Sequence, residues 1–294
     1  MPSAREMRLR IRSVKNIGQV TRALEAVSAS KVRKAVAANQ ATKPYAEKAW
    51  KVILHLARQP GRSSVHPLLT DRSVVRNILV VLITSDRGLA GASNINVIRK
   101  MFDYFENSSA PVSFVTIGKK GRDILVRGRY PIEGDFSPMA SPAAYRDVSP
   151  VGNLVITDFK LEKFDQVFLA YNLFENMMVQ KPVIRRILPV EIELDGSGGS
   201  PFDRTHPSKS VFIYEPEQEE LLNEIVPRFT SMQILQAVLS AQASEHAARM
   251  IAMRNATDNA TELASTLQLE YNKVRQQTIT NDLLDIAGGV IALE

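Results

Sequence analysis

The sequence predicts an α/β protein in which a mostly parallel, Rossmann-like sheet domain is inserted between long N- and C-terminal helices that form an antiparallel coiled coil. Near both ends of the chain, apolar or small residues recur at steps of three and four, as on one face of a helix. Between the ends, short apolar segments alternate with helical patterns, which is typical of a parallel sheet. We expect a coiled-coil helix over 1–60, a linker over 61–75, the α/β domain over 76–215 and a second coiled-coil helix over 216–294.

The N-terminal helix is expected from about Ser3 to about Arg58. Pro44 should kink it, because proline removes a backbone donor and clashes with the preceding turn. The stretch QPGRSSVHP, residues 59–67, should end the helix as a loop. The predicted stripe is narrow and rich in alanine in its second half: Met7, Ile11, Val14, Ile17, Val20, Leu24, Val27, Val32, Ala35, Ala38, Ala46, Ala49, Ile53 and Leu56.

The middle of the chain is predicted to alternate strands with helices. The expected strands are 76–86, 112–118, 130–136, 166–174, 182–190 and 210–215. The expected helices are 93–105, a short one near 121–127, and 148–162. Ser93 or Asn94 should cap the first of these helices, because both residue types favour that position. The glycine-rich stretch 196–207 is expected to be a surface loop.

The C-terminal helix should begin after the acidic segment YEPEQEE. Pro227 is expected to kink it or to split off a short first helix, and the next glycine or proline is Gly288. About 70 residues at about 1.5 Å each give a rod about 100 Å long, which is typical of a coiled coil. The predicted stripe comprises Leu222, Ile225, Phe229, Met232, Leu235, Leu239, Ala243, Ile251, Ala260, Leu263, Leu267, Val274, Thr278, Leu283 and Ile286.

Composition excludes several classes of protein. The 294 residues include no cysteine, so a disulfide framework, a thiolate metal site and a cysteine nucleophile are all excluded. The longest purely apolar run, Ile78 to Ile83, is far shorter than the roughly 20 residues of a membrane-spanning helix. The arginine-rich start of the chain lacks the apolar core of a signal peptide. We therefore expect a soluble, cytoplasmic protein.

Charge is distributed unevenly along the chain. Residues 1–62 carry fourteen basic and three acidic side chains, residues 63–216 are nearly balanced, and residues 217–294 carry five basic and eleven acidic side chains. A basic arm and an acidic arm can lie side by side, or each can face a partner of opposite sign. Drift in the charge of two solvated helix surfaces is the simpler alternative.

The turn SDRGLAGASN after the first strand could cradle a phosphate, because it joins a buried strand to a helix. However, Gly88 and Gly91 fit neither the dinucleotide-binding pattern nor a P-loop, and IGKKGRD lacks P-loop spacing as well. We therefore interpret these glycines as structural. The four histidines lie in different segments without metal-ligand spacing. The sequence thus predicts no catalytic residues, no metal site and no cofactor.

Four segments together resemble one family over essentially the whole chain. RIRSVKNIGQVTRALEAVSASKVRKA, TSDRGLAGASN, YEP and ARMIAMRNATDNATEL…YNKVRQQTITNDLLDIAGGVIAL are similar, in this order, to the gamma subunit of F-type ATP synthase. The resemblance implies the non-catalytic central rotor shaft of F1. Such a shaft links proton-driven rotation of the c-ring to ATP synthesis or hydrolysis on the beta subunits. The implied partners are the alpha, beta and epsilon subunits and the c-ring. The implied location is peripheral, on the cytoplasmic face of the bacterial plasma membrane.

The resemblance also implies three groups of contact residues. Those facing an acidic loop of the beta subunit are Leu24, Lys31, Arg33 and Lys34. Those contacting loops of the alpha/beta ring are Arg275, Gln276 and Thr280. Those forming a foot on the c-ring are Phe212, Tyr214 and Glu215. The sequence departs from the family at Ala90 and Ala92, where relatives often carry cysteine and glycine, and Pro227 is unexpected.

Two alternatives from other classes remain open. An α/β nucleotide-binding enzyme with a helical dimerisation stalk would bind nucleotide tightly, which the glycine spacing disfavours. A nucleic-acid binder would use the basic arm, and its affinity would fall steeply with salt. Tyr45 and Trp50 are the only aromatic residues of that arm and are too few for a stacking platform.

Overall fold

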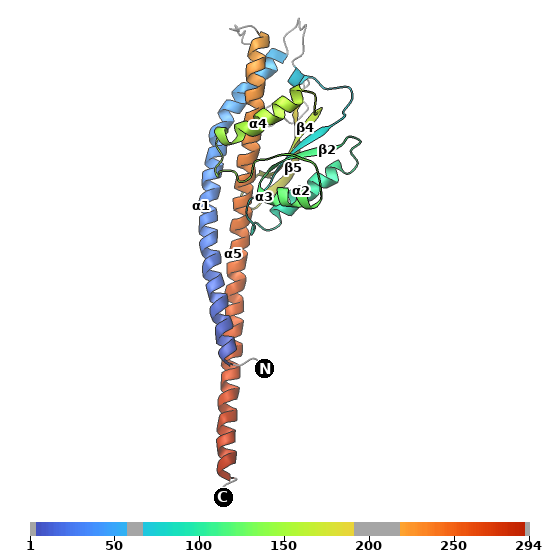
Figure 1. Cartoon of the computed structure of the whole chain (residues 1–294). Helices are drawn as coiled ribbons and strands as arrows, with labels where there is room; N and C mark the ends of the chain where they lie inside the picture. Colours follow the sequence, from blue (N-terminus) through green and yellow to red (C-terminus); the bar gives the residue numbers. More distant parts are fainter. Residues whose placement is uncertain (1–3, 58–66, 191–217, 292–294) are drawn as a thin grey trace. The chain divides into compact units, whose positions relative to one another are not determined.

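The computed structural model describes residues 4–57, 67–190 and 218–291 (Figure 1). The chain divides into two compact units. We call residues 1–28 and 249–294 the rod, and residues 29–248 the body. Two long helices, α1 (Ala4–Ala57) and α5 (Gln218–Ile291), contribute to both units. The long terminal helices that the sequence predicts are thereby confirmed.

The body contains a mostly parallel sheet, as predicted. Its strands are β1 (Ile78–Ile83), β2 (Val112–Ile117), β3 (Ile132–Asp135), β4 (Gln166–Phe174) and β5 (Gln180–Leu188). Their order is β3-β2-β1-β4-β5, and only β5 is antiparallel to its neighbour. It follows β4 through a hairpin, so it returns along the strand it has just left. The predicted strand 210–215 and loop 196–207 lie outside the described residues.

The shorter helices are η1 (Pro67–Leu69), α2 (Ser93–Phe105), α3 (Lys119–Arg127) and α4 (Tyr145–Lys160). The prediction that Ser93 or Asn94 caps α2 is wrong. Ala92 occupies the capping position without a side-chain hydrogen bond. The Asn94 side chain instead accepts a hydrogen bond from the Ser85 backbone N–H at 3.0 Å, which closes the turn after β1.

Both faces of the sheet are covered, so every residue of β1 is buried. Leu79, Val81 and Ile83 belong to a core shared with α1, α4 and α5. The alternate residues of β1 face a second core that includes α2 and α3. In the larger core, Trp50 of α1 stacks on Phe229 of α5 with ring centroids 5.5 Å apart. Aromatic packing therefore ties the two long helices together within the body.

In the rod, α1 and α5 run antiparallel. Thr21 Oγ1 and Thr257 Oγ1 are 2.7 Å apart, and a Cβ on Gly18 would lie 3.5 Å from the Cβ of Ala260. Gly18 precedes Thr21 in α1, whereas its neighbour Ala260 follows Thr257 in α5, so the two helices run in opposite directions. The predicted pairing of the two terminal helices is confirmed here. The buried residues of the rod are Met7, Ile11, Thr21, Ser28, Met253, Thr257, Ala260 and Ala264.

The predicted seam is wrong in part. Ile17, Val20 and Val27 of α1 are 52%, 59% and 53% exposed, and Leu263 of α5 is 49% exposed. The buried positions of α1 keep an average spacing of 3.5 residues, as in a coiled coil. The stripe predicted for this helix contains several consecutive steps of three residues, which are shorter than the 3.6-residue helical turn. The predicted positions therefore rotate around the helix axis towards solvent. Small and polar residues therefore occupy the seam where larger apolar ones were expected.

Neither proline interrupts its helix. Pro44 lies inside α1 and Pro227 inside α5, and both helices continue on each side. Pro227 therefore does not split off a short first helix, and the alternative expectation of a kink stays a prediction, as it does for Pro44. Among the described helices, none combines the length and apolarity required to cross a membrane.

Candidate partner-binding surfaces

The C-terminal end of α5 extends beyond the start of α1 within the rod (Figure 1). Met7 is buried near the start of α1, whereas every described side chain of α5 after Val274 is exposed. Arg275, Gln276 and Thr280 all lie on this single-helix extension. The Thr280 hydroxyl donates to the Gln276 carbonyl oxygen at 2.9 Å, a bond inside the helix. All three side chains are accessible to a partner.

Large apolar side chains on the same extension face solvent. The exposed fractions are 50% for Ile279, 61% for Leu283, 63% for Leu284 and 66% for Ile286. Exposed apolar side chains that gather at one end of a helix are typical of protein–protein contact surfaces. The extension therefore offers both polar and apolar contacts.

The basic cluster, defined as Lys31, Arg33 and Lys34, lies on the part of α1 that belongs to the body. All three side chains are exposed, and none forms an ion pair with any residue in the described ranges. Val32 and Ala35, with 0% and 1% exposure, fix the buried side of the helix at this point. The cluster therefore presents uncompensated positive charge to solvent.

Leu24, predicted to act with the basic cluster, lies on the part of α1 that belongs to the rod. Its side chain is half-buried, and its carbonyl oxygen accepts a hydrogen bond from the Ser28 hydroxyl at 2.7 Å. Leu24 is thus less accessible than the three cations that follow it two turns later on the same helix. Phe212, Tyr214 and Glu215, predicted to form a foot, lie outside the described residues.

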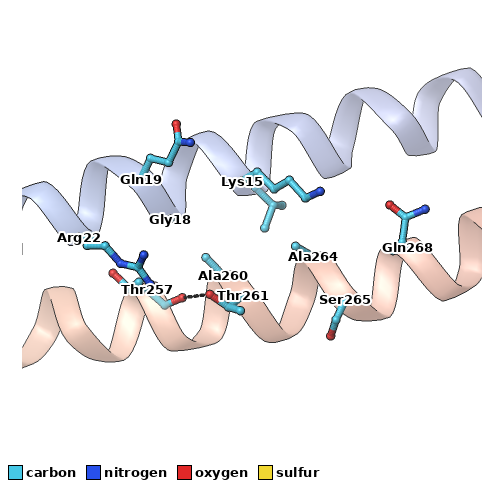
Figure 2. A pocket seen from close by; sticks show the side chains of 11 residues that line it. Lys15, Gly18, Gln19, Arg22, Thr257, Ala260, Thr261, Ala264, Ser265 and Gln268 are labelled. Atoms are coloured by element: carbon cyan, nitrogen blue, oxygen red, sulfur yellow. Dashed lines mark hydrogen bonds between the residues drawn. The ribbon is translucent and has the colours of Figure 1, made fainter.

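A groove of about 450 Å³ lies between α1 and α5 in the rod (Figure 2). Small residues shape it where the helices approach each other, among them Gly18, Ala260 and Ala264. Lys15 and Arg22 supply positive charge from the α1 side. Sequence reasoning missed this groove, because a glycine and two alanines at helical spacing indicate close packing rather than a surface feature.

In the IGKKGRD stretch, the backbone N–H groups at the start of α3 are already bonded to the residues that follow β1. At the start of α3, Lys119 N–H donates to Asp86 Oδ1 at 3.1 Å and Lys120 N–H to the Ser85 carbonyl at 3.1 Å. Gly121 N–H donates to Thr84 Oγ1 at 2.8 Å. The Asp86 carboxylate therefore stands at a helix N-terminus where a phosphate would bind.

Close packing accounts for two glycines at this edge of the sheet. Gly118 has φ +105°, and a Cβ there would lie 2.1 Å from the Thr84 carbonyl oxygen. A Cβ on Gly121 would lie 2.8 Å from Thr84 Oγ1. These two glycines let α3 approach β1. A Cβ on Gly88 or Gly91 would meet no atom within 4 Å, and of these two only Gly91 has a positive φ, +55°, so close packing does not explain Gly88. No group of three His, Cys, Asp or Glu side chains within the described ranges is arranged to hold a metal ion.

Ion pairs with shifted pKa values lie in the body and fix its loops. Burial alone would raise the pKa of Asp165, but hydrogen bonds from Arg72 and from the N–H groups of Arg76 and Asn77 outweigh burial and lower it. Arg72 Nη1 lies 2.7 Å from the Asp165 carboxylate. Arg72 also donates to the carbonyl oxygens of Phe164 and Phe159. These contacts tie the segment before β1 to the segment before β4.

An α/β unit and a two-helix rod that both expose charged or apolar side chains are typical of a subunit that binds other proteins. A family model described as ATP synthase matches residues 3–293. An ATP synthase gamma chain of Dehalococcoides mccartyi is 42% identical over 294 residues, covering all of both chains. A gamma chain of Roseiflexus castenholzii is 42% identical over 299 residues, covering 100% of this chain and 99% of the relative. The chain therefore belongs to the ATP synthase gamma chain family.

Solved structures share the fold. The rotor of Euglena gracilis mitochondrial ATP synthase contains a chain that matches with TM-score 0.64 and 19% identity, covering 94% of this chain and 98% of that one. The central stalk and c-ring structure of Tetrahymena thermophila mitochondrial ATP synthase gives TM-score 0.58 and 24% identity, with 81% and 99% coverage. The fold is thus found in rotor and central-stalk assemblies.

Proposed function

We propose that this chain is the central rotor shaft of an F1Fo ATP synthase. It would transmit proton-driven rotation of the c-ring to the beta subunits, where ATP is made or hydrolysed. The observation that supports this proposal most directly is the single-helix extension of α5, whose polar and apolar side chains are exposed in a full-length member of the gamma chain family. A shaft whose end turns inside a ring of other subunits requires such a surface.

The exposed groups suit three different partners. Arg275, Gln276 and Thr280 would contact polar loops of the alpha/beta ring, and the apolar end of α5 would turn in an apolar sleeve of that ring. The basic cluster, with Leu24 next to it in sequence, would meet acidic loops of the beta subunits. Phe212, Tyr214 and Glu215 would form the foot on the c-ring, near the epsilon subunit.

Charge and shape support the assignment of the acidic loops to the basic cluster. Lys31 and Lys34 are neighbours on one helix face, and Arg33 points about 100° away from Lys34. Positive charge therefore covers more than one side of α1, as a turning shaft needs if it meets several subunits in succession. Each exposed ion pair contributes about 0–1 kcal/mol, so these contacts can form and break during rotation.

The chain would be a non-catalytic subunit, with catalysis on the beta subunits. The bonded amide groups of Lys119, Lys120 and Gly121 support this proposal, because they leave no free donors at the start of α3 for a nucleotide phosphate. The chain would be held on the cytoplasmic face of the bacterial plasma membrane through the c-ring. The α/β enzyme with a dimerisation stalk is the disfavoured alternative.

Co-expression with the alpha, beta and epsilon subunits tests the proposal. We expect a stable ATPase particle that contains this chain and in which a probe on the chain rotates when ATP is added. A chain ending before Leu283 should assemble or transmit torque less well, while fluorescence of Trp50, the only tryptophan, reports an unchanged body. Failure of the full-length chain to join the particle, or tight nucleotide binding by the isolated chain, would contradict the proposal.

A further inference from the structure

A short stretch of α5 inside the body carries four polar side chains that are almost completely buried. The exposed fractions are 4% for Ser240, 8% for Gln242, 0% for Ser244 and 3% for His246. Buried polar groups destabilise a fold unless they are hydrogen-bonded, so their partners reveal why they are there. Each of the four bonds to a segment outside α5.

Ser240 and Ser244 hold the end of β4. The Ser240 hydroxyl oxygen accepts a hydrogen bond from the Phe174 backbone N–H at 2.9 Å. One turn later, the Ser244 hydroxyl donates to the Asn172 carbonyl oxygen at 3.0 Å. Asn172 also donates from its side chain to Ser93 at the start of α2. This side of α5 is therefore fastened to the sheet and, through it, to α2.

Gln242 and His246 hold the loop between β3 and α4. Gln242 Nε2 donates to the Ala140 carbonyl oxygen at 2.6 Å, and Gln242 Oε1 accepts from the Ala143 N–H at 3.1 Å. One turn later, His246 Nε2 lies 2.9 Å from the Ser141 hydroxyl oxygen. The Gln242 side chain thus forms hydrogen bonds with both ends of the segment 140–143, and the His246 imidazole contacts Ser141 within that segment.

The two sets of bonds lie on nearly opposite sides of the helix. At about 100° per residue, Ser240 and Ser244 share one side, and Gln242 lies about 160° around the axis from Ser240. Hydrogen bonds are directional and weaken steeply when bent. Bonds on opposite sides must move in opposite directions when a helix turns about its axis, so together they resist that motion. The buried residues Ala243 and Ala247 have short side chains, so van der Waals packing at these positions resists rotation of the helix only weakly.

We infer that these four residues form a clamp through which the α/β domain and α5 turn as one piece. The clamp is defined as Ser240, Gln242, Ser244 and His246. This inference rests on the proposed function, in which torque from the c-ring enters the α/β domain. Because α5 continues unbroken to Ile291, a twist applied to the domain reaches the helix at the clamp and passes along it. The clamp residues are positioning residues that set the torsional stiffness of the rotor.

The test measures torsional stiffness in the assembled particle. The chain has no cysteine, so Asn107→Cys, at an exposed position after α2, allows a bead to be attached at one site. With the ring immobilised and stalled by a non-hydrolysable nucleotide, the thermal variance of the bead angle reports stiffness. Ser240→Ala/Gln242→Met/Ser244→Ala removes hydrogen bonds on both sides of α5. We expect this clamp variant to raise the variance about two-fold, because the contact of His246 with Ser141 is then the one directional bond of the clamp that is left.

Two controls separate a clamp from general stability. Gln236→Met makes the same chemical change on α5, at a side chain whose buried Nε2 has no hydrogen-bond partner among the described residues. Ile234→Ala removes a fully buried apolar side chain and leaves all clamp bonds in place. Both controls should keep the variance of the parent chain. If the clamp variant does not assemble, Ser244→Ala and Gln242→Met are measured singly, each with a smaller increase expected.

The outcomes distinguish the two proposals. A clamp variant whose variance equals that of the parent chain, or is matched by Ile234→Ala, overturns the clamp while rotation still supports the shaft. A parent chain that neither assembles nor rotates overturns the proposed function itself.

Discussion

The rod and the body are built from the same two helices but are stabilised in different ways. In the body, α1 and α5 bury large side chains such as Trp50, Ile53 and Phe229 against a sheet and a third helix. In the rod, the large apolar side chains buried among the described residues are Met7, Ile11 and Met253. The rest of that seam is alanine, serine and threonine. The rod thus obtains far less hydrophobic stabilisation per residue than the body.

The exposed surface of the rod shows where the missing stabilisation would come from. Its exposed large apolar residues are Leu9, Ile17, Val20, Val27, Leu263, Leu269, Ile279, Leu283, Leu284 and Ile286. A two-helix rod cannot cover these side chains by itself, whereas a surrounding ring of subunits could. The comparison teaches that the body buries a core of its own, whereas the rod leaves large apolar side chains that partners would cover under the proposed function.

The largest expected effect is in the body. Phe229→Ala removes a fully buried ring that stacks on Trp50 and should lower the free energy of unfolding by about 3–5 kcal/mol. Ile17→Ala in the rod is the matched control and should stay within about 0.5 kcal/mol, because Ile17 is 52% exposed. Urea denaturation measures both, followed by Trp50 fluorescence for the body and by circular dichroism at 222 nm for the helices of the rod. Equal losses for the two variants would contradict the division into a packed body and a thinly packed rod.

The next effect concerns the ion pair of the body. Arg72→Met leaves the Asp165 carboxylate, only 7% exposed, without its cation and should cost about 2–3 kcal/mol at neutral pH. Because the folded-state pKa of Asp165 is lowered, its stabilisation is present above about pH 4 and is lost as the pH falls through the folded-state value. The difference between parent and variant should therefore be constant from pH 5 to 8 and shrink in more acidic solution.

Denaturation of both chains at a series of pH values checks this expectation. Arg146→Met is the control, because Arg146 is 89% exposed and its ion pair with Asp147 is weak. A difference that grows below pH 4 would show that the Asp165 contact favours the protonated carboxyl instead.

The body could be predicted well from sequence because its signals are strong and local. Ile78 to Ile83 is a continuous apolar run, and only a strand covered on both faces needs one. The predicted strands 112–118 and 166–174 correspond to β2 and β4 for similar reasons. The predicted strand 130–136 corresponds to β3, which has no such run and none of whose residues is buried. The antiparallel direction of β5 also has a signal, which the prediction of a mostly parallel sheet did not use: residues 175–179 between β4 and β5 are too few for a parallel crossover, which needs about a dozen residues or more.

The seam and the clamp could not be found in the same way. Gly18, Thr21 and Ser28 are too small or too polar to mark a core position, although their spacing from Ile11 fits a coiled coil. Gln242 and His246 look like solvent-facing residues, and only the fold shows that a loop distant in sequence bonds to them. Partner contacts are harder still to predict from sequence, because an exposed lysine such as Lys31 occurs at the same helical spacing whether it faces solvent or binds a partner.

A smaller effect is expected in the rod. Thr257→Val keeps the side-chain volume but removes the 2.7 Å hydrogen bond to Thr21, and should destabilise the helix pair by about 1 kcal/mol. Thr261→Val is a close control, since its hydroxyl is exposed and bonds only to the Thr257 carbonyl in the same helix. Amide hydrogen exchange over residues 10–25 measures the difference. Unchanged exchange in Thr257→Val would mean that the Thr21 contact contributes nothing to the rod.

The smallest expected effect on stability should carry the largest effect on coupling. Reversing Lys31, Arg33 and Lys34 to glutamate changes only exposed side chains without an ion pair among the described residues, so each change should alter unfolding by at most about 0.5 kcal/mol. If the basic cluster meets acidic loops of the ring, the reversal replaces attraction by repulsion. ATP-driven proton pumping should then fall far more than ATP hydrolysis does, whereas any single change to alanine should have a modest effect.

The control reverses Lys43, Lys48 and Lys51, which are also exposed on α1 and carry the same total charge. Pumping and ATPase assays on membranes that contain each variant measure the ratio. The loss should be greatest at low ionic strength, where exposed charges are least screened. Normal coupling under that condition would show that the cluster is a solvated surface and that the rod and the extension of α5 alone engage the ring.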